Sequence, residues 1–299
     1  MPLTLGTSFA KASAGASSVK RMYRGTSSAW NADAADWVSR VYAAGATVSS
    51  STANAVTAFC NAIDAAGIRD RFYRMGIFAG SSLTAALVPL YRGPSLAGTQ
   101  YGNATDTNNG PFVSADYAET GAAGGLDPNG NGNKHLNTGY KPLDTGSAIV
   151  EYGHVCWWSM TLTTARQNII GARKDSAPAS FAGAQIDNLG RAWGGWGTGT
   201  TSINSAGSTS APFFGSLTRR SDGRVYYRIN DTAVTDAASS APNGTNANFA
   251  VFAMSFDTGS FAAGPHRMSG YSVGAELSAQ QASSLYDAWN TFQIALGRK

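Results

Sequence analysis

The feature that most constrains the fold is a series of strand-like runs, separated by turn residues, that fills the chain from residue 147 onward. The clearest local signal is SLTRRSDGRVYYRIN, in which Asp222 and Gly223 stand between two such runs. Asp-Gly is a pair that two-residue type I′ hairpins prefer. About ten strand-like runs divided by turns indicate two packed sheets. We therefore predict a mainly β fold, a two-sheet antiparallel jelly-roll sandwich.

Two runs predict how strands are buried in that sandwich. In HVCWWSMTLTT, alternate residues fall on two faces, one more apolar than the other, which is typical of an antiparallel strand with one buried face. One face would carry Cys156, Trp158, Met160 and Leu162, and the other Val155, Trp157, Ser159 and Thr161. NFAVFAMSF is apolar at successive positions, which predicts a central strand.

Helical spacing appears near the beginning of the chain and again at its end. NADAADWVSRVYAAG predicts a helix that Asn31 or Asp33 caps and Gly45 ends. A second helix would begin at Ser51 or Thr52 and end at Gly67. We expect IRDRFYRMGIF and LTAALVPLYRGP to continue this helical region, with local ion pairs for Arg69, Arg71, Arg74 and Arg92.

The closing helix has the clearest start signal. Ser278 and Gln281 have the spacing of a capping box. Leu285, Trp289, Phe292 and Leu296 then form one apolar stripe, which we expect to lie against the sandwich. The patterns thus divide the chain into an extended basic arm over 1–30, a helical region over 31–94, a linker over 95–111, and a sandwich with its closing helix over 112–299.

Charge is sparse and unevenly placed. Only 13% of the 299 residues are charged, and the net charge is +4. Four basic residues and no acid lie in residues 1–30, which leaves 18 basic against 18 acidic residues elsewhere. A neutral body lacks the dense basic face that nucleic acid requires, and no apolar run approaches the length of a membrane span. We expect neither nucleic-acid binding nor membrane insertion.

The basic arm contains Lys11, Lys20, Arg21 and Arg24. It lacks the apolar core of a secretory signal, although its Ser-rich, acid-free composition also describes a mitochondrial transit peptide. A disordered tail is one alternative, because few bulky apolar residues offset the ordering entropy. The other is an arm that docks on a neighbouring subunit.

The order of several motifs supports a resemblance to a known superfamily. GNGNKHLNTGY, NIIGARKD, the hairpin with VYYRINDTAV, and HRMSGYSVGAELSAQQASSLYDAWNTFQIALGR follow one another as in the concanavalin A-like lectins and glucanases of laminin-G-like form. The resemblance covers residues 112–299. The segment DWVSRVYAAGATVSSSTANAVTAFCNAIDAAGIRDRFYR is similar to one found ahead of such jelly rolls in tailed-bacteriophage proteins. This resemblance implies a virion structural protein.

Residues for catalysis or metal binding are scattered. Glucanases of this superfamily place two glutamates and an aspartate on one strand, and retaining enzymes need carboxyls about 5 Å apart. Glu119, Glu151 and Glu276 have no such neighbours, and the histidines 135, 154 and 266 are isolated. Cys60 and Cys156 have no paired spacing, so we expect buried thiols. We predict no enzyme, no cofactor and no metal site.

One loop leaves calcium binding open. Asp127, Asn129, Asn131 and Gly132 match the start of an EF-hand loop, but Thr138 stands where its glutamate belongs. The same residues also make an ordinary turn.

Three tryptophans are the candidate ligand-binding residues. Trp193 and Trp196 flank Gly194-Gly195, where a bulge could bring both rings to one side as a platform for sugars. Trp157 belongs with them, because the alternation places it beside Ser159 and Thr161. The alternative is that these rings fill the core or cover glycines.

The sequence favours a non-enzymatic structural component of a bacteriophage virion, on the head, collar or tail, with a lectin-like adhesion domain. Its partners would be other virion proteins and copies of itself. The first alternative is a carbohydrate-binding module for host-surface glycans, and the second is a divergent glycosidase.

Overall fold

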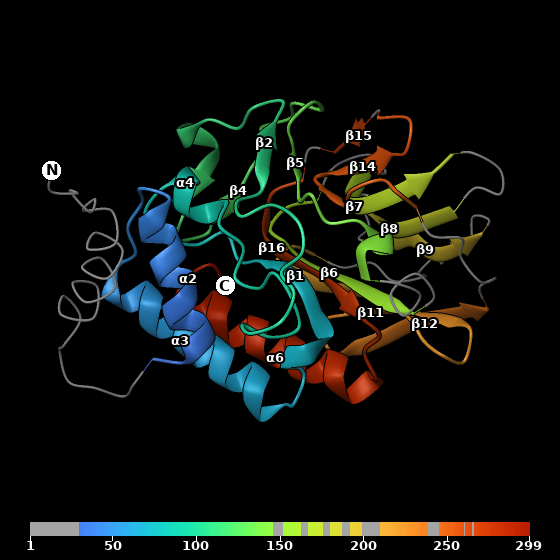
Figure 1. Ribbon diagram of the computed structural model, residues 1–299, viewed down its shortest axis with the longest axis horizontal. Coiled ribbons are helices and arrows are strands. Elements are labelled where there is room, and N and C mark those ends of the chain that lie inside the picture. The colour runs from blue at the N-terminus through green and yellow to red at the C-terminus, as the bar shows by residue number, and fades with distance from the viewer. Residues whose placement is uncertain are drawn as a thin grey trace, which may run out of the picture.

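The computed structural model describes residues 30–145, 152–162, 167–175, 180–186, 192–198, 210–238, 245–259, 261–264 and 266–299. These residues form two eight-stranded sheets with helices on one side (Figure 1). The predicted two-sheet sandwich is confirmed. None of the described helices is long and apolar enough to cross a bilayer.

The first sheet contains the predicted hairpin and the strand before the closing helix. Its order is β12 (Thr232–Ala238), β11 (Arg224–Ile229), β10 (Phe213–Arg219), β6 (Gly153–Ser159), β16 (Met268–Ala275), β4 (Gly125–Leu126) and β3 (Tyr117–Ala118), and β1 (Phe72–Gly76) also pairs with β16.

The second sheet faces the inner side of the first. Its order is β15 (Phe261–Ala263), β14 (Ala253–Phe256), β7 (Gln167–Lys174), β13 (Ala250–Val251), β5 (His135–Asn137) and β2 (Thr107–Asn109), while β8 (Ser180–Ile186) pairs with β7 and β9 (Ala192–Thr198). Strands β1 and β2 come from residues before 112, so both sheets extend beyond the segment assigned to the sandwich.

The helices cover the outer face of the first sheet. They are α2 (Ala32–Ala43), α3 (Ser50–Ala65) and α6 (Ala279–Ala295). The single turn α4 (Leu83–Ala86) instead contributes Leu83 and Ala86 to the cluster between the sheets. One apolar cluster joins α2, α3 and α6 to Cys156 and Trp158 of β6. A second cluster, between the sheets, contains Val155 and Trp157. Strand β6 is therefore buried on both faces. The expectation that the face with Val155 and Trp157 reaches solvent is wrong, because the second sheet covers that face while the helices cover the other.

The helix boundaries agree with the capping signals, with one exception. Asn31 caps α2 through its side-chain oxygen, and Gly45 follows with a φ of 82°. The closing helix has the expected capping box of Ser278 and Gln281. Helix α3 is capped by Ser49, not by Ser51 or Thr52, because Ser49 has extended backbone and accepts from the Thr52 amide at 3.1 Å.

Residues 68–93 differ most from expectation. Residues Arg69–Arg71 form a 3-10 turn, and the next five residues are strand β1, which pairs with β16. Only Arg71 has a local ion pair, with Asp70 at 3.6 Å. Arg69 pairs with Asp33 and Arg74 with Asp106, so tertiary contacts across more than 30 residues replace the predicted local pairs.

Two strand predictions also need correction in detail. The hairpin exists, but Arg220 and Arg224 pair across a three-residue loop in which Gly223 has a φ of 76°. A type I′ turn would need positive φ at Asp222 as well, which the structure does not show. The predicted strand in NFAVFAMSF is central, but Phe252, with a φ of 65°, divides it into β13 and β14.

Candidate functional site

Trp157, one of the predicted ligand-binding residues, lies between the two sheets. Its side chain is 0% exposed and stacks on Tyr227 with ring centroids 6.3 Å apart. A Cβ atom at Gly215 would come within 2.2 Å of the Trp157 ring, so the glycine makes room for it. The expected stacking of a sugar on Trp157 disagrees with this burial, because both ring faces are covered.

Trp193 and Trp196 lie on β9, which pairs residue by residue with β8. Trp193 is opposite Gln185 and Trp196 is opposite Ala182, with no shift of register between them. The bulge expected at Gly194-Gly195 is therefore absent from this ladder. The side chains of these two tryptophans lie outside the described residues, and their binding role stays a prediction. The basic arm with Lys11, Lys20, Arg21 and Arg24 also lies outside them.

The acids that the sequence singles out hold the backbone in place. Glu119 Oε1 accepts hydrogen bonds from the Thr52 hydroxyl at 2.7 Å and the Gly80 amide at 2.8 Å. Glu276 accepts from the Ser221 amide at 2.7 Å. Glu151 lies outside the described residues. The two described glutamates thus join loops and helices to the sandwich.

The loop that matches the start of a calcium motif is held by protein groups. Asp127 accepts from the Asn129 amide at 2.9 Å and from Arg267 at 2.5 Å. Asn131 accepts from the Asn133 amide at 3.0 Å, which is the pattern of an Asx turn. Among the described residues, no group of three or more His, Cys, Asp or Glu side chains could hold a metal ion.

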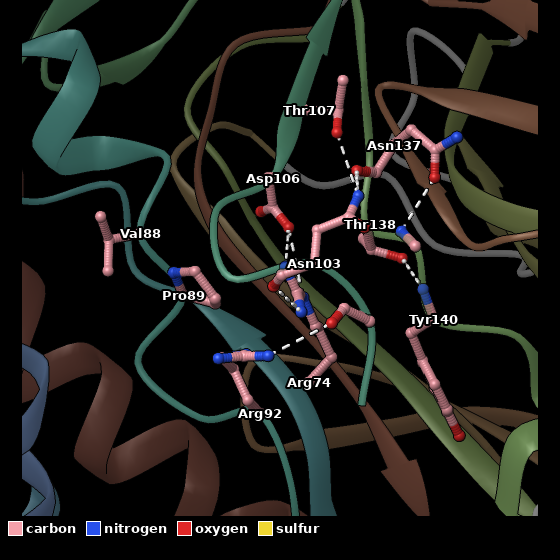
Figure 2. Close-up of polar contacts among 12 residues, drawn as sticks. Arg74, Val88, Pro89, Arg92, Asn103, Asp106, Thr107, Asn137, Thr138 and Tyr140 are labelled. Carbon is pink, nitrogen blue, oxygen red and sulfur yellow. Dashed lines mark hydrogen bonds and ion pairs between the residues drawn. The ribbon is translucent and has the colours of Figure 1, made fainter. Parts of the chain in front are cut away.

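A buried ion pair joins strand β1 to the loop that precedes β2 (Figure 2). Arg74 on β1 donates to Asp106 Oδ1 at 2.5 Å, and the Tyr271 hydroxyl donates to Asp106 Oδ2 at 2.6 Å. Burial opposes the charge on Arg74, but Asp106 outweighs it and keeps the pKa of Arg74 above its usual value. Arg74 therefore stays charged inside the protein.

The same guanidinium positions a loop. Arg74 Nη1 donates to the carbonyl oxygens of Tyr101 at 2.9 Å and Asn103 at 2.7 Å. Gly102, between them, has a φ of 69°, and a Cβ there would lie 2.4 Å from the Thr138 carbonyl oxygen. Only glycine fits this close approach. The backbone on either side of Gly102 is thus fixed against the sandwich.

Three tyrosines meet beside this loop, and we call them the tyrosine surface. The rings of Tyr73 and Tyr101 are half-buried, with centroids 5.3 Å apart. Tyr140 is fully buried, 6.3 Å from Tyr73 and 5.9 Å from Tyr101. Burial, and then the neighbouring Tyr101 and Asp70, raise the pKa of Tyr73, so its phenol is neutral at ordinary pH.

A backbone irregularity explains why Tyr73 reaches the surface. Phe72 pairs with Gly274 and Arg74 pairs with Val273, which leaves Tyr73 as an additional residue in β1. Such a bulge redirects one side chain out of the regular alternation. Arg74 can therefore point inward while the ring of Tyr73 stays partly exposed.

Sequence reasoning missed the tyrosine surface, because the segment with Tyr73 reads as helix and the segment with Tyr101 reads as linker. Two weak signals were present: Tyr101 is a large aromatic in the small, polar stretch TQYGNAT, and Tyr73 stands between arginines. Neither signal shows that residues 73, 101 and 140 meet in space.

Comparisons with known proteins reveal similarity of fold only. No protein-family model matches the chain, and no curated protein matches it. A mutant Trypanosoma rangeli sialidase displaying trans-sialidase activity matches with a TM-score of 0.50 and 10% identity, over 79% of this chain and 39% of that chain.

A second solved structure is the Ruminococcus gnavus IT-sialidase CBM40 bound to α2,3-sialyllactose. It matches with a TM-score of 0.36 and 16% identity, over 48% of this chain and 88% of that chain. This chain spans between 32% and 39% of the length of the sialidases that it matches. At these identities the likeness to the sialidase in the first match is one of fold, and it agrees with a β sandwich.

Proposed function

We propose that this protein is a glycan-binding module without catalytic activity, and that it binds glycans on the tyrosine surface. The observation that carries the proposal is the half-buried pair Tyr73 and Tyr101, held 5.3 Å apart over a buried third ring. Aromatic faces stack on sugar rings, and tyrosine adds a hydroxyl for hydrogen bonds. A lectin-like sandwich supplies the rigid support.

The surface is preorganised, which favours binding. Tyrosine has few rotatable bonds, so little side-chain entropy is lost when a bound ligand immobilises the ring. The buried Arg74 fixes the carbonyl of Tyr101, and a bulge sets the direction of Tyr73. A ligand would find both rings already in position, so less binding energy is lost to ordering.

The first experiment screens the purified protein against an array of neutral and acidic oligosaccharides, and then measures the affinity of each hit by calorimetry. We expect Tyr73→Ala and Tyr101→Ala each to cost about 1–2 kcal/mol of binding, or roughly 5- to 30-fold in Kd. Thermal unfolding of the variants shows whether the fold is retained.

Tyr226→Ala is the matched control. Tyr226 is also half-buried, but it lies on β11, under the Arg220 guanidinium at 3.9 Å, and β10, β6 and β16 separate it from β1. This variant should keep full affinity. A hit that Trp196→Ala abolishes, and that neither tyrosine variant weakens, would transfer the binding site to β9 and contradict the proposal.

The absence of catalysis is tested on the same hits. Incubation of the protein with each bound oligosaccharide should leave the glycan intact by mass spectrometry. Turnover that a single substitution of Glu119 or another acid abolishes would support the glycosidase alternative instead.

We further propose that the module belongs to a bacteriophage virion, on the similarity of the helical segment to those that precede jelly rolls in phage proteins. Peptide mass spectrometry of purified particles from the encoding phage should detect this chain at a fixed copy number. Its recovery from the lysate without the particles would contradict this placement.

A further inference from the structure

Helices α3 and α6 pack against each other on the side of the molecule away from the second sheet (Figure 1). A groove of about 430 Å³ lies between them. Its size is in the range of cavities that hold small ligands or a few side chains. Exposed alanines form its walls and aromatic rings its floor. The principal residues are Ala58, Ala62, Ala65 and Ala295 in the walls, and Phe59 and Phe292 in the floor.

The groove is apolar but open to solvent. The alanines of its walls, Ala58, Ala62, Ala65 and Ala295, are all exposed. Small side chains on two neighbouring helices allow the backbone of a third segment to approach closely. Apolar side chains of that segment would then cover the exposed alanines of the walls.

The position of the start of α2 identifies the segment that could occupy the groove. Asn31, at the start of α2, donates to Asn61 Oδ1 at 3.0 Å and to Asp64 Oδ2 at 2.7 Å, both on α3. Asn61 is one residue from Ala62 in the groove wall. Residues 25–29 can span roughly 16 Å when extended, so residues 19–24 can reach the groove.

The composition of residues 19–24 fits this surface. Val19, Met22 and Tyr23 have the i, i+3, i+4 spacing that places apolar side chains on one helix face. The other three residues of the segment, Lys20, Arg21 and Arg24, are basic. Asp287 lies in the groove wall and Asp64 beside it, so the charges are complementary.

We propose that residues 19–24 of the arm dock in the α3–α6 groove of their own chain. The apolar residues of the segment pack against the exposed alanines of the walls, and the basic residues lie near the acids at the rim of the groove. The tether through residues 25–29 gives the segment an effective concentration in the millimolar range, which favours its own chain over a second copy. This inference does not depend on glycan binding.

Limited trypsin digestion of the full chain tests the proposal. Cleavage after Arg24 requires the docked segment to leave the groove, whereas Lys11 lies outside it and serves as an internal control. We expect cleavage after Arg24 to be about tenfold slower than after Lys11, because proteolysis tracks the population of the open form. Peptide mass spectrometry follows both sites.

Two substitutions test whether the protection of Arg24 from trypsin depends on the groove. Ala62→Arg places a bulky cation in the groove wall and should remove the protection of Arg24. Ser39→Arg adds the same charge at an exposed position of α2, outside the groove, and should leave the protection unchanged. Thermal unfolding confirms that both variants fold.

The results of the digestion distinguish docking of the arm on its own chain from docking on a second copy. Protection that is independent of protein concentration, in a monomer by light scattering, supports the proposal. Protection that appears only with dimer formation overturns it in favour of a second copy. Equal cleavage after Lys11 and Arg24, or protection that survives Ala62→Arg, overturns docking in this groove altogether.

Discussion

The buried pair of Arg74 and Asp106 allows a quantitative test of how the sandwich supports the tyrosine surface. The two side chains are 0% and 1% exposed, and Asp106 accepts from both Arg74 and Tyr271. Asp106→Asn removes the negative charge and leaves the Arg74 cation buried without compensation. Breaking a buried pair in this way costs about 3–5 kcal/mol of the free energy of unfolding.

For a chain of this size, each kcal/mol lowers Tm by about 2–4 °C, so Asp106→Asn should lower it by roughly 6–20 °C. The variant should also weaken glycan binding, because Asp106 holds the Arg74 guanidinium that anchors the loop with Tyr101. Circular dichroism on heating measures the first effect, and calorimetry with the glycan hit measures the second.

Asp36→Asn is the control. It breaks the Arg40–Asp36 pair, whose side chains are 23% and 41% exposed, and should change stability by at most about 1 kcal/mol. Equal losses for the two variants would refute the reasoning, since they would show that burial of the Arg74 pair adds nothing. A stable Asp106→Asn protein with unchanged affinity would show that the pair does not support the loop.

Two further predictions concern packing and pH. Gly270→Ala should cost about 1–3 kcal/mol of the free energy of unfolding by overpacking, because its Cβ would lie 2.1 Å from the Trp289 ring. Urea titration measures this loss. In the control Gly132→Ala, the new Cβ would have nothing within 4 Å, so the free energy of unfolding should not change. Burial lowers the pKa of His154 and of His266 to about 4, so the unfolded chain binds more protons below pH 6.5. Stability should therefore be constant from pH 7 to 8 and should decrease between pH 6.5 and 4, by roughly 3 kcal/mol for each histidine; an unchanged urea midpoint from pH 7 to pH 4.5 would contradict this.

Local signals predicted the elements whose stabilising groups are neighbours in the chain. Asn31 and Ser278 cap helices because the amides that they satisfy lie two or three residues away. The hairpin at Gly223 forms where a positive φ is needed, and the apolar stripe of the closing helix is buried as its spacing indicates.

Local signals failed where a distant segment decides the environment. Strand β1 reads as part of a helical region, yet its hydrogen bonds go to β16, about 200 residues later in the chain. Arg74 reads as a surface residue with a nearby partner, but the fold encloses it and supplies Asp106. Trp157 reads as half-exposed, because the sequence does not show that the second sheet covers its face.

The amino-acid sequence by itself determined a β sandwich with capped helices, a body without net charge and a basic arm, since these depend on composition and on spacings of a few residues. Only the tertiary structure decided which aromatic rings reach solvent. Tyr73, Tyr101 and Tyr140 become neighbours because a bulge, a glycine and a buried ion pair fix three separate segments against one another. Contacts of this kind depend on the whole fold, and no local pattern encodes them.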